Sequence, residues 1–383
     1  MSTDKNGKKY RGVTLHKSGN YIGRFQYLGK NYELYDKDEK QCYKRLQDLR
    51  YEVRHGTYIK NSKQNVDTWF NIWLKEYKDL HVKKGSKQVY TDAYRLYIKN
   101  SIGKMQLQAV KGEHIQKIYN DLKRKGYSNS TIDIVATVLS GMFKRAYINK
   151  HILDNPVKTA CSNFKEEKET EMRVMSKDEQ KLFLEFAKDT WIYPLIVVAL
   201  NTGMRSGELR GLTWDKIKFD KRWITVNKSL LYLDKQYLLG ETKTKSSIRN
   251  IPLVDEVYQV LKKHKKEQMQ KRLALGSLWK EKEGMENLVF PSDTGYPMNR
   301  DRLKVQVNKI VENIQKAGYD FKHITPHTLR HTFATRCIEK GVEPKVLQKI
   351  LGHSKISQTM DLYVHVEDDF KVEEMKKIAN LFN

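Results

Sequence analysis

The chain has 383 residues, and its 72 Lys and Arg against 46 Asp and Glu give a net charge of +26 that is spread along the sequence. Such a surplus favours a nucleic-acid partner over an anionic membrane surface, which a single polybasic tail or anchor would suit better. The sequence has no long apolar stretch and no signal-like start, so neither membrane insertion nor export is expected. Its three cysteines, Cys42, Cys161 and Cys337, lie far apart, so a zinc scaffold is not expected either. We expect a cytoplasmic protein.

The first expected elements form a small three-stranded meander followed by a helix. The strands cover residues 10–15, 21–27 and 30–35, with turns at 17–20 and 28–29. In the middle strand, alternation places Phe25 on one face and Arg24 and Gln26 on the other. The helix begins after Asp36 or Asp38 and ends at Gly56. The exposed sheet face predicts DNA contact through Arg24 and Gln26, and a plain folded cap is the alternative.

A helical block follows a polar linker near residues 61–65. Apolar and aromatic residues recur at helical spacing and predict about four helices. The first helix begins at Val66, and the others are expected near residues 86–99, 112–124 and 129–147. The helical block ends at Asn155-Pro156. The aromatic residues of these stripes are expected in a core, so the block is predicted to be a small helical bundle.

The last part of the chain follows a charged tract at 165–170 and is mostly helical. Ser176 and Glu179 form a capping box at its first helix. Strands are expected at 223–227, 237–241 and 248–252, and a tight turn at 295–297. The chain is therefore predicted to be multidomain and mainly α with small antiparallel sheets. The expected domains are residues 1–59, 64–160 and 172–383.

Arg205 and Glu208 form the first candidate cluster. Gly203 interrupts an apolar helix, so Arg205 is expected at the start of the next helix, where its guanidinium can bind a phosphate through two hydrogen bonds. Glu208 lies three residues later on the same helical face and can hold the arginine in place. A surface salt bridge is the competing interpretation of this pair.

The second cluster is the segment from Thr325 to Thr335. Pro326 suits the first turn of a helix, which places His327, Arg330 and His331 on one face as donors to a phosphate. The two histidines also have the spacing of a zinc-protease helix. That motif requires Glu where Thr328 stands, so no metal ligand is assigned.

The third cluster contains Leu351-Gly352-His353 and, ten residues after the histidine, Tyr363. The order Arg205, His327-x-x-Arg330, Leu-Gly-His353 and Tyr363 resembles the tyrosine recombinase, or phage-type integrase, family. The likeness is strongest to integrases of conjugative transposons and phages of Gram-positive bacteria. It implies an arm-site DNA-binding domain at 1–59, a core-site DNA-binding domain at 64–160 and a catalytic domain at 172–383.

The resemblance also implies a mechanism. Tyr363 is the expected nucleophile, with Arg205, His327, Arg330 and His353 around the phosphate and Glu208 and His331 in supporting roles. The family requires a lysine on a β-hairpin. Lys243, between two strand-like runs, is the expected general acid, and Lys245 fits nearly as well. No metal, ATP or other cofactor is expected.

The expected partners are double-stranded DNA with core-type and arm-type sites, and three further copies of the chain in a homotetramer on two DNA sites. Excision factors or host DNA-bending proteins are expected helpers. An apolar stripe from Val372 to Phe382 is expected to pack either on its own domain or on a neighbouring copy. Two other functions stay open from the sequence, a non-catalytic DNA-binding regulator and a metal-dependent nuclease.

Overall fold

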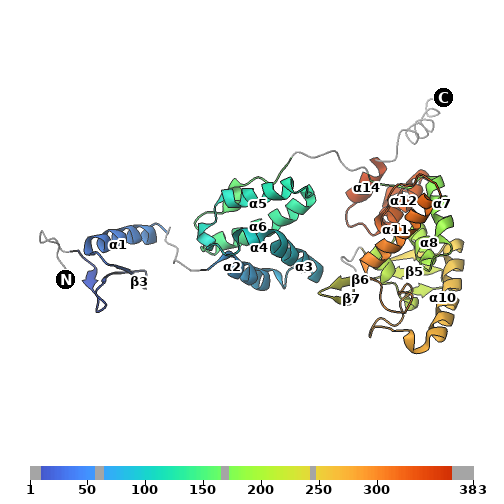
Figure 1. Ribbon diagram of the computed structural model, residues 1–383, viewed down its shortest axis with the longest axis horizontal. Coiled ribbons are helices and arrows are strands. Elements are labelled where there is room, and N and C mark those ends of the chain that lie inside the picture. Colours follow the sequence, from blue (N-terminus) through green and yellow to red (C-terminus); the bar gives the residue numbers. More distant parts are fainter. Residues whose placement is uncertain (1–9, 57–63, 165–171, 242–246, 365–383) are drawn as a thin grey trace, which may run out of the picture. The chain divides into compact units, whose positions relative to one another are not determined.

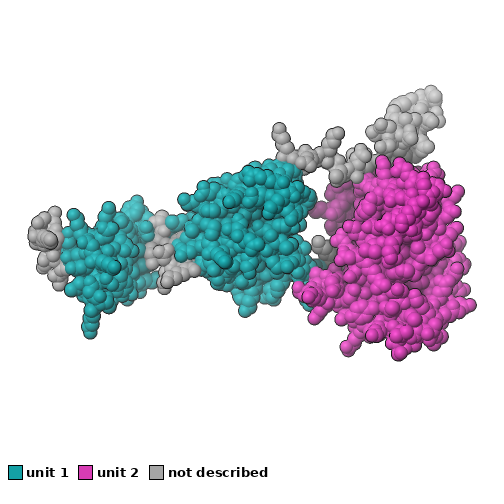
Figure 2. Space-filling model, in the orientation of Figure 1, with its two compact units in different colours: residues 1–167 teal, residues 168–383 magenta. Residues whose placement is uncertain are grey.

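The computed structural model describes residues 10–56, 64–164, 172–241 and 247–364 (Figure 1). The chain divides into two compact units, residues 1–167 and 168–383 (Figure 2). Both units are built mainly from helices with small antiparallel sheets, which confirms the predicted fold class. Within the described residues, no helix is both long and apolar enough to cross a lipid bilayer.

The first unit begins with the predicted meander and helix. Its elements are β1 (Val13–Leu15), β2 (Tyr21–Tyr27), β3 (Lys30–Asp36) and α1 (Glu39–Arg54). The Asp38 carboxylate accepts from the Gln41 amide and so caps α1. Leu46 and Cys42 of α1 are fully buried with Val13. A side chain at Gly23 would meet Leu46 at 3.2 Å, so the helix lies directly on the middle strand.

The other face of β2 exposes Arg24 and Gln26, as the alternation predicted. Arg24 pairs in register with Glu33 of β3, and its Nε lies 3.3 Å from the glutamate Oε2. The two side chains are 62% and 54% exposed, so solvent screens this ion pair. Arg24 is therefore accessible to a partner, although Glu33 offsets part of its charge.

Residues 64–164 contain the predicted bundle. Its elements are α2 (Val66–Ile72), η1 (Trp73–Lys78), α3 (Lys84–Ala93), η2 (Tyr94–Ile98), α4 (Lys99–Ile102), η3 (Leu107–Ala109), α5 (Gly112–Arg124), α6 (Asn129–Ile148) and η4 (Pro156–Thr159). Helix α2 continues into η1, and α3 continues into η2 and α4. Together with α5 and α6, the longer elements in this range therefore form four continuous helical segments. Trp69 and Trp73 are buried, and the Trp69 indole donates to the Met142 carbonyl at 2.9 Å. The aromatic residues are core residues, as predicted.

The second unit surrounds a buried helix. Its helical elements are α7 (Lys177–Ala187), α8 (Tyr193–Thr202), α9 (Ser206–Arg210), η5 (Trp214–Lys216), α10 (Asp255–Leu275), η7 (Gly276–Leu278), α11 (Arg300–Lys316), α12 (Pro326–Glu339), α13 (Pro344–Leu351) and α14 (Ser357–Val364). Helix α8 is apolar on all sides and contacts α7, α10 and α12. It forms the centre of the core that supports the motif segments.

Two small antiparallel sheets complete the second unit. Their strands are β4 (Ile217–Lys218), β5 (Trp223–Val226), β6 (Lys228–Leu233), β7 (Gln236–Glu241) and β8 (Arg249–Pro252). One sheet has the order β4-β5-β8 and the other pairs β6 with β7. Strands β4 and β6 were not predicted. The strands flanking 242–246 belong to different sheets, so the expected simple hairpin around Lys243 is wrong: β7 pairs with β6, and β8 pairs with β5.

Gly203 makes the turn between α8 and α9. Its φ of +60° lies in the left-handed region, and it ends α8 as predicted. A Cβ atom there would overlap the Phe333 ring and lie 2.8 Å from Leu351 Cδ2. Glycine is thus required both by the backbone and by the close approach of α12 and α13.

We predict that Gly203→Ala lowers the free energy of unfolding by about 2–4 kcal/mol, because it adds left-handed strain and overlap with a packed core. Gly341→Ala is the matched control. Its φ is +73° and no atom lies within 4 Å of the position that its Cβ would take, so only about 1 kcal/mol should be lost. Urea denaturation compares the two, and equal losses would contradict the steric argument.

Candidate active site

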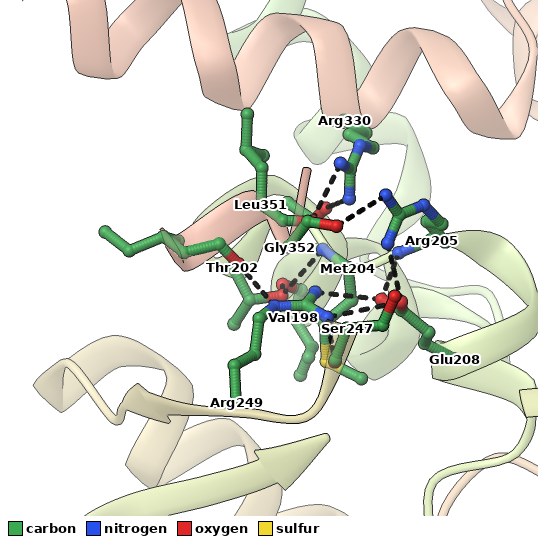
Figure 3. Close-up of polar contacts among 12 residues, drawn as sticks. Val198, Thr202, Met204, Arg205, Glu208, Ser247, Arg249, Arg330, Leu351 and Gly352 are labelled. Carbon is green, nitrogen blue, oxygen red and sulfur yellow. Dashed lines mark hydrogen bonds and ion pairs between the residues drawn. The ribbon is translucent and has the colours of Figure 1, made fainter. Parts of the chain in front are cut away.

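The site is organised around the carbonyl end of α13. The last carbonyl groups of a helix lack partners within it and carry the negative end of the helix dipole. Gly352, with φ +65°, ends α13 in the left-handed conformation. Three arginines from distant segments donate to three successive carbonyl groups there: Arg249 Nε to Ile350 at 2.5 Å, Arg330 Nη2 to Leu351 at 2.9 Å, and Arg205 Nη2 to Gly352 at 3.0 Å. Figure 3 shows the three arginines around Leu351 and Gly352.

Arg205 stands immediately before α9, as predicted, and Glu208 holds it. The glutamate Oε2 accepts from the Arg205 amide at 2.9 Å, and Oε1 accepts from Arg205 Nη1 at 2.9 Å. Glu208 is only 3% exposed, whereas the Arg205 side chain is 35% exposed. The pair is therefore not a surface salt bridge. Its buried carboxylate fixes a guanidinium that still reaches solvent.

Arg330 lies beside Arg205 and is buried. Its Nη1 donates to the Gly203 carbonyl at 2.7 Å, so it joins the turn before α9 to the end of α13. Burial, followed by the charge of Arg205, lowers the pKa of Arg330 to about 9. The guanidinium is still a cation at neutral pH. Two neighbouring cations beside one buried carboxylate are stabilised by a bound anion such as phosphate.

His353 follows the same helix end. Its Nδ1 lies 2.9 Å from the hydroxyl of Thr359, which is fully buried. Burial, followed by Arg330 and Arg205, lowers the pKa of His353 to about 4, so the imidazole is neutral at pH 7. When the Thr359 hydroxyl donates to Nδ1, Nε2 carries the proton and is the remaining hydrogen-bond donor of the ring.

His327 and His331 occupy successive turns of α12, as predicted, and their ring centroids are 6.4 Å apart. Partial desolvation, followed by the charges of Arg300 and Arg330, lowers the pKa of the exposed His327. Burial and then His327 lower the pKa of the half-buried His331 to about 4. In the part of the chain that the structure describes, no three His, Cys, Asp or Glu side chains are grouped to hold a metal ion.

Tyr363 lies on α14, and its hydroxyl bonds a backbone group that does not belong to the carbonyl end of α13. The hydroxyl donates to the Val342 carbonyl at 2.5 Å, and the ring packs in a cluster with Phe333 and Cys337. Burial, followed by Cys337, raises the pKa of Tyr363. The structure thus gathers Arg205, Arg330 and the backbone before His353, while the hydroxyl of Tyr363 bonds the loop after α12.

Two sets of predicted residues lie outside the described part of the chain. Lys243 and Lys245 fall in residues 242–246, and the apolar tail stripe falls in residues 365–383. Their expected roles stay predictions.

Sequence reasoning missed Arg249. It shares the inward face of β8 with Ile251, because alternate residues of a strand face the same way, and both are buried. An arginine at a core-facing strand position requires buried partners. That alternation was the signal that could have identified it.

Comparison with known proteins identifies the family. Residues 173–369 match a model described as the phage integrase family, and residues 65–123 match one described as the phage integrase N-terminal SAM-like domain. The chain belongs to the phage integrase family. It is accordingly a tyrosine-type site-specific DNA recombinase, as the order of the motifs predicted.

Relatives match most of the recombinase. It is 30% identical to a "Tyrosine recombinase XerC-like" of Caldanaerobacter subterraneus subsp. tengcongensis, over 99% of this chain and 98% of that protein. It is 28% identical to the "Transposase from transposon Tn916" of Enterococcus faecalis, over 73% of this chain and 69% of that protein. These names agree with the predicted likeness to integrases of mobile elements in Gram-positive bacteria.

Solved structures give the same result. The Tn1549 transposon integrase in complex with transposon right-end DNA matches with a TM-score of 0.70 and 28% identity, covering 82% of this chain and 100% of that one. A lambda integrase dimer bound to a core site matches with a TM-score of 0.56 and 17% identity, over 94% and 95% of the two chains. The second likeness shows the shared fold.

The neutral histidines predict a pH-dependent stability. Between pH 6.5 and about 4, an unfolded histidine binds a proton that folded His331 and His353 do not. The contribution of these two histidines to the free energy of unfolding therefore falls as pH falls through this window and is constant above it. We predict that His331→Gln reduces this slope, measured by urea denaturation from pH 7.5 to about 4.5. The exposed His323, replaced by Gln, is the control. An unchanged slope in His331→Gln would contradict the assignment.

Proposed function

We propose that this recombinase integrates and excises a mobile DNA element, with Arg205 and Arg330 binding the scissile phosphate and Tyr363 attacking it. The observation that carries the proposal is the pair of guanidinium groups held on neighbouring carbonyls at the end of α13. A phosphodiester under attack gains negative charge on its non-bridging oxygens. Donors fixed before the reaction stabilise that charge without reorganisation.

The arginines retain donors for this task. A guanidinium has five N–H groups. Arg330 uses two of them in hydrogen bonds to Gly203 and Leu351, and Arg205 uses two in hydrogen bonds to Glu208 and Gly352. Within the described residues, the remaining donors of both side chains are free to meet phosphate oxygens. His353 adds a neutral donor at the same helix end.

The proposed cleavage step proceeds at a phosphodiester of the DNA backbone. The Tyr363 oxygen bonds to phosphorus and forms a 3′-phosphotyrosine, while the bond to the 5′ oxygen breaks. His327, kept neutral by its lowered pKa, takes the tyrosine proton, and Lys243 gives a proton to the leaving 5′ oxygen. Tyr363 must first leave the Val342 carbonyl.

Rejoining is the same step in reverse with a different strand. The 5′-hydroxyl of a partner strand attacks the phosphotyrosine and releases Tyr363, so the energy of the broken bond is conserved and no ATP is consumed. Two such rounds through a four-way junction exchange two duplexes. We propose that four copies of the chain act on two DNA sites. A lambda integrase tetramer bound to a Holliday junction shares the fold of this chain and supports this arrangement.

The first unit is proposed to supply DNA recognition. Residues 64–160, which include the match to the SAM-like domain, would bind the core site, and residues 1–59 would bind arm sites through the β2 face that bears Arg24 and Gln26. The DNA in the Tn1549 integrase complexes supports duplex DNA as the partner. Excision or DNA-bending factors are proposed helpers.

The first functional prediction concerns the nucleophile. Tyr363→Phe should bind core-site DNA with unchanged affinity but form no covalent protein–DNA adduct, because only the hydroxyl is removed. The measurement is adduct formation on a nicked suicide substrate in EDTA, followed on a denaturing gel.

Tyr319→Phe is the matched control, since that tyrosine is exposed on the same unit. An adduct in Tyr363→Phe would move the nucleophile to another residue. Cleavage by the unmodified chain that stops in EDTA would favour a metal-dependent nuclease, and DNA binding with no cleavage under any condition would favour a regulator.

The second functional prediction concerns the N-terminal sheet. Arg24→Ala should weaken binding of arm-type DNA by roughly 1–3 kcal/mol, as expected for one lost DNA contact, and leave core-site cleavage unchanged. Lys44→Ala, an exposed cation on α1, is the control for nonspecific charge. Equal weakening by both variants in a band-shift titration would remove the sheet face from the proposal.

A further inference from the structure

Arg249 is buried where three segments of the site meet. Its side chain is 6% exposed. Nε donates to the Ile350 carbonyl. Nη1 donates to the Ser247 carbonyl and to Glu208 Oε1, both at 3.2 Å, and Nη2 donates to Glu208 Oε2 at 2.8 Å (Figure 3). These contacts use four of the five N–H groups of a guanidinium. Arg249 therefore differs from Arg205, because protein groups occupy four of its five donors and its side chain is 6% exposed against 35%.

The Glu208 carboxylate is shared by two arginines. It accepts two hydrogen bonds from the backbone and side chain of Arg205 and two from the side chain of Arg249. A carboxylate has about four acceptor positions, so these donors fill it. Burial by itself would raise the pKa of Glu208, but Arg249 and then Arg205 hold it below its usual value. Arg249 thus keeps the carboxylate that orients Arg205 ionised and fixed.

Arg249 also packs against the backbone that precedes His353. A Cβ atom at Gly352 would lie 3.0 Å from Arg249 Nη1. The same glycine carbonyl accepts from Arg205. The Arg249 side chain therefore contacts both residues that hold Arg205, namely Glu208 through its carboxylate and Gly352, whose carbonyl accepts from Arg205.

We infer that Arg249 is a positioning residue of the recombination reaction, which locks Glu208 to the end of α13 so that Arg205 faces the scissile phosphate. The inference rests on the proposed function, because it takes Arg205 as a phosphate ligand. Arg249 itself contacts neither DNA nor the reacting atoms. It acts through Arg205.

The test is the rate of covalent adduct formation under single-turnover conditions on a nicked suicide substrate, expressed per DNA-binding-competent molecule. Arg249→Met keeps the apolar stem and removes the charge and donors. We expect a rate about 100-fold lower, the scale of one lost preorganised contact to the transition state, with core-site affinity retained. Arg249→Lys keeps the charge but cannot span Glu208 and Ile350 together, and should recover the rate to within about tenfold of the unmodified chain.

The matched control is Arg336→Met. Arg336 is a partly buried arginine that binds a glutamate, Glu339, and a backbone carbonyl, Met175, away from the end of α13. The Arg336→Met variant should have a lower thermal stability but an unchanged rate of adduct formation per DNA-binding-competent molecule. Normalising to competent molecules keeps the test valid where Arg249→Met is unstable, and Arg249→Lys gives a second reading on a milder variant.

Coupling to Arg205 separates positioning from general stability. If Arg249 acts through Arg205, then Arg249→Met added to Arg205→Lys should slow the reaction by less than about threefold beyond Arg205→Lys alone. Losses that multiply in the double variant, or an Arg249→Met rate equal to that of the unmodified chain, would overturn the inference. Failure of the unmodified chain to form any adduct would instead overturn the proposed function, and the inference with it.

Discussion

The carbonyl end of α13 is the constraint on which the site depends. Its unpaired carbonyl groups and negative dipole end attract cations, and three guanidinium groups from β8, the start of α9 and α12 satisfy three successive carbonyls. Buried arginines are unfavourable without such partners. The same helix end therefore both permits these cations in the interior and fixes the distance between them.

The charges of this group are unbalanced in a way that suits its chemistry. The group contains three guanidinium groups and one buried carboxylate, Glu208, which accepts from Arg205 and Arg249. Burial together with neighbouring charges lowers the pKa of Arg330. The excess positive charge reaches solvent at Arg205, the most exposed member. Mutual repulsion of these cations favours an anion at this position, so an affinity for anions and the neutral histidines both follow from one arrangement of burial and charge.

The hydroxyl of Tyr363 is held by a separate contact. The Tyr363 hydroxyl bonds Val342 after α12, and the tyrosine ring belongs to the small core of α12, α13 and α14. The arginines are fixed by their own network, whereas the tyrosine is fixed by one hydrogen bond and side-chain packing. The hydroxyl of Tyr363 is therefore held independently of the arginines.

The sequence by itself determined the local features: the helix start at Arg205, the pairing of Glu208 with it, the helix end at Gly203, the capping of α7 and the face shared by His327 and His331. Spacing of three or four residues decides these contacts. Only the tertiary structure decided that Arg249 joins Ile350, which is 101 residues away, and that the Tyr363 hydroxyl bonds Val342, 21 residues away. It also decided that β7 and β8 enter different sheets. Such contacts depend on how whole elements pack, and helical or strand periodicity carries no information about which distant partner a buried charge will meet.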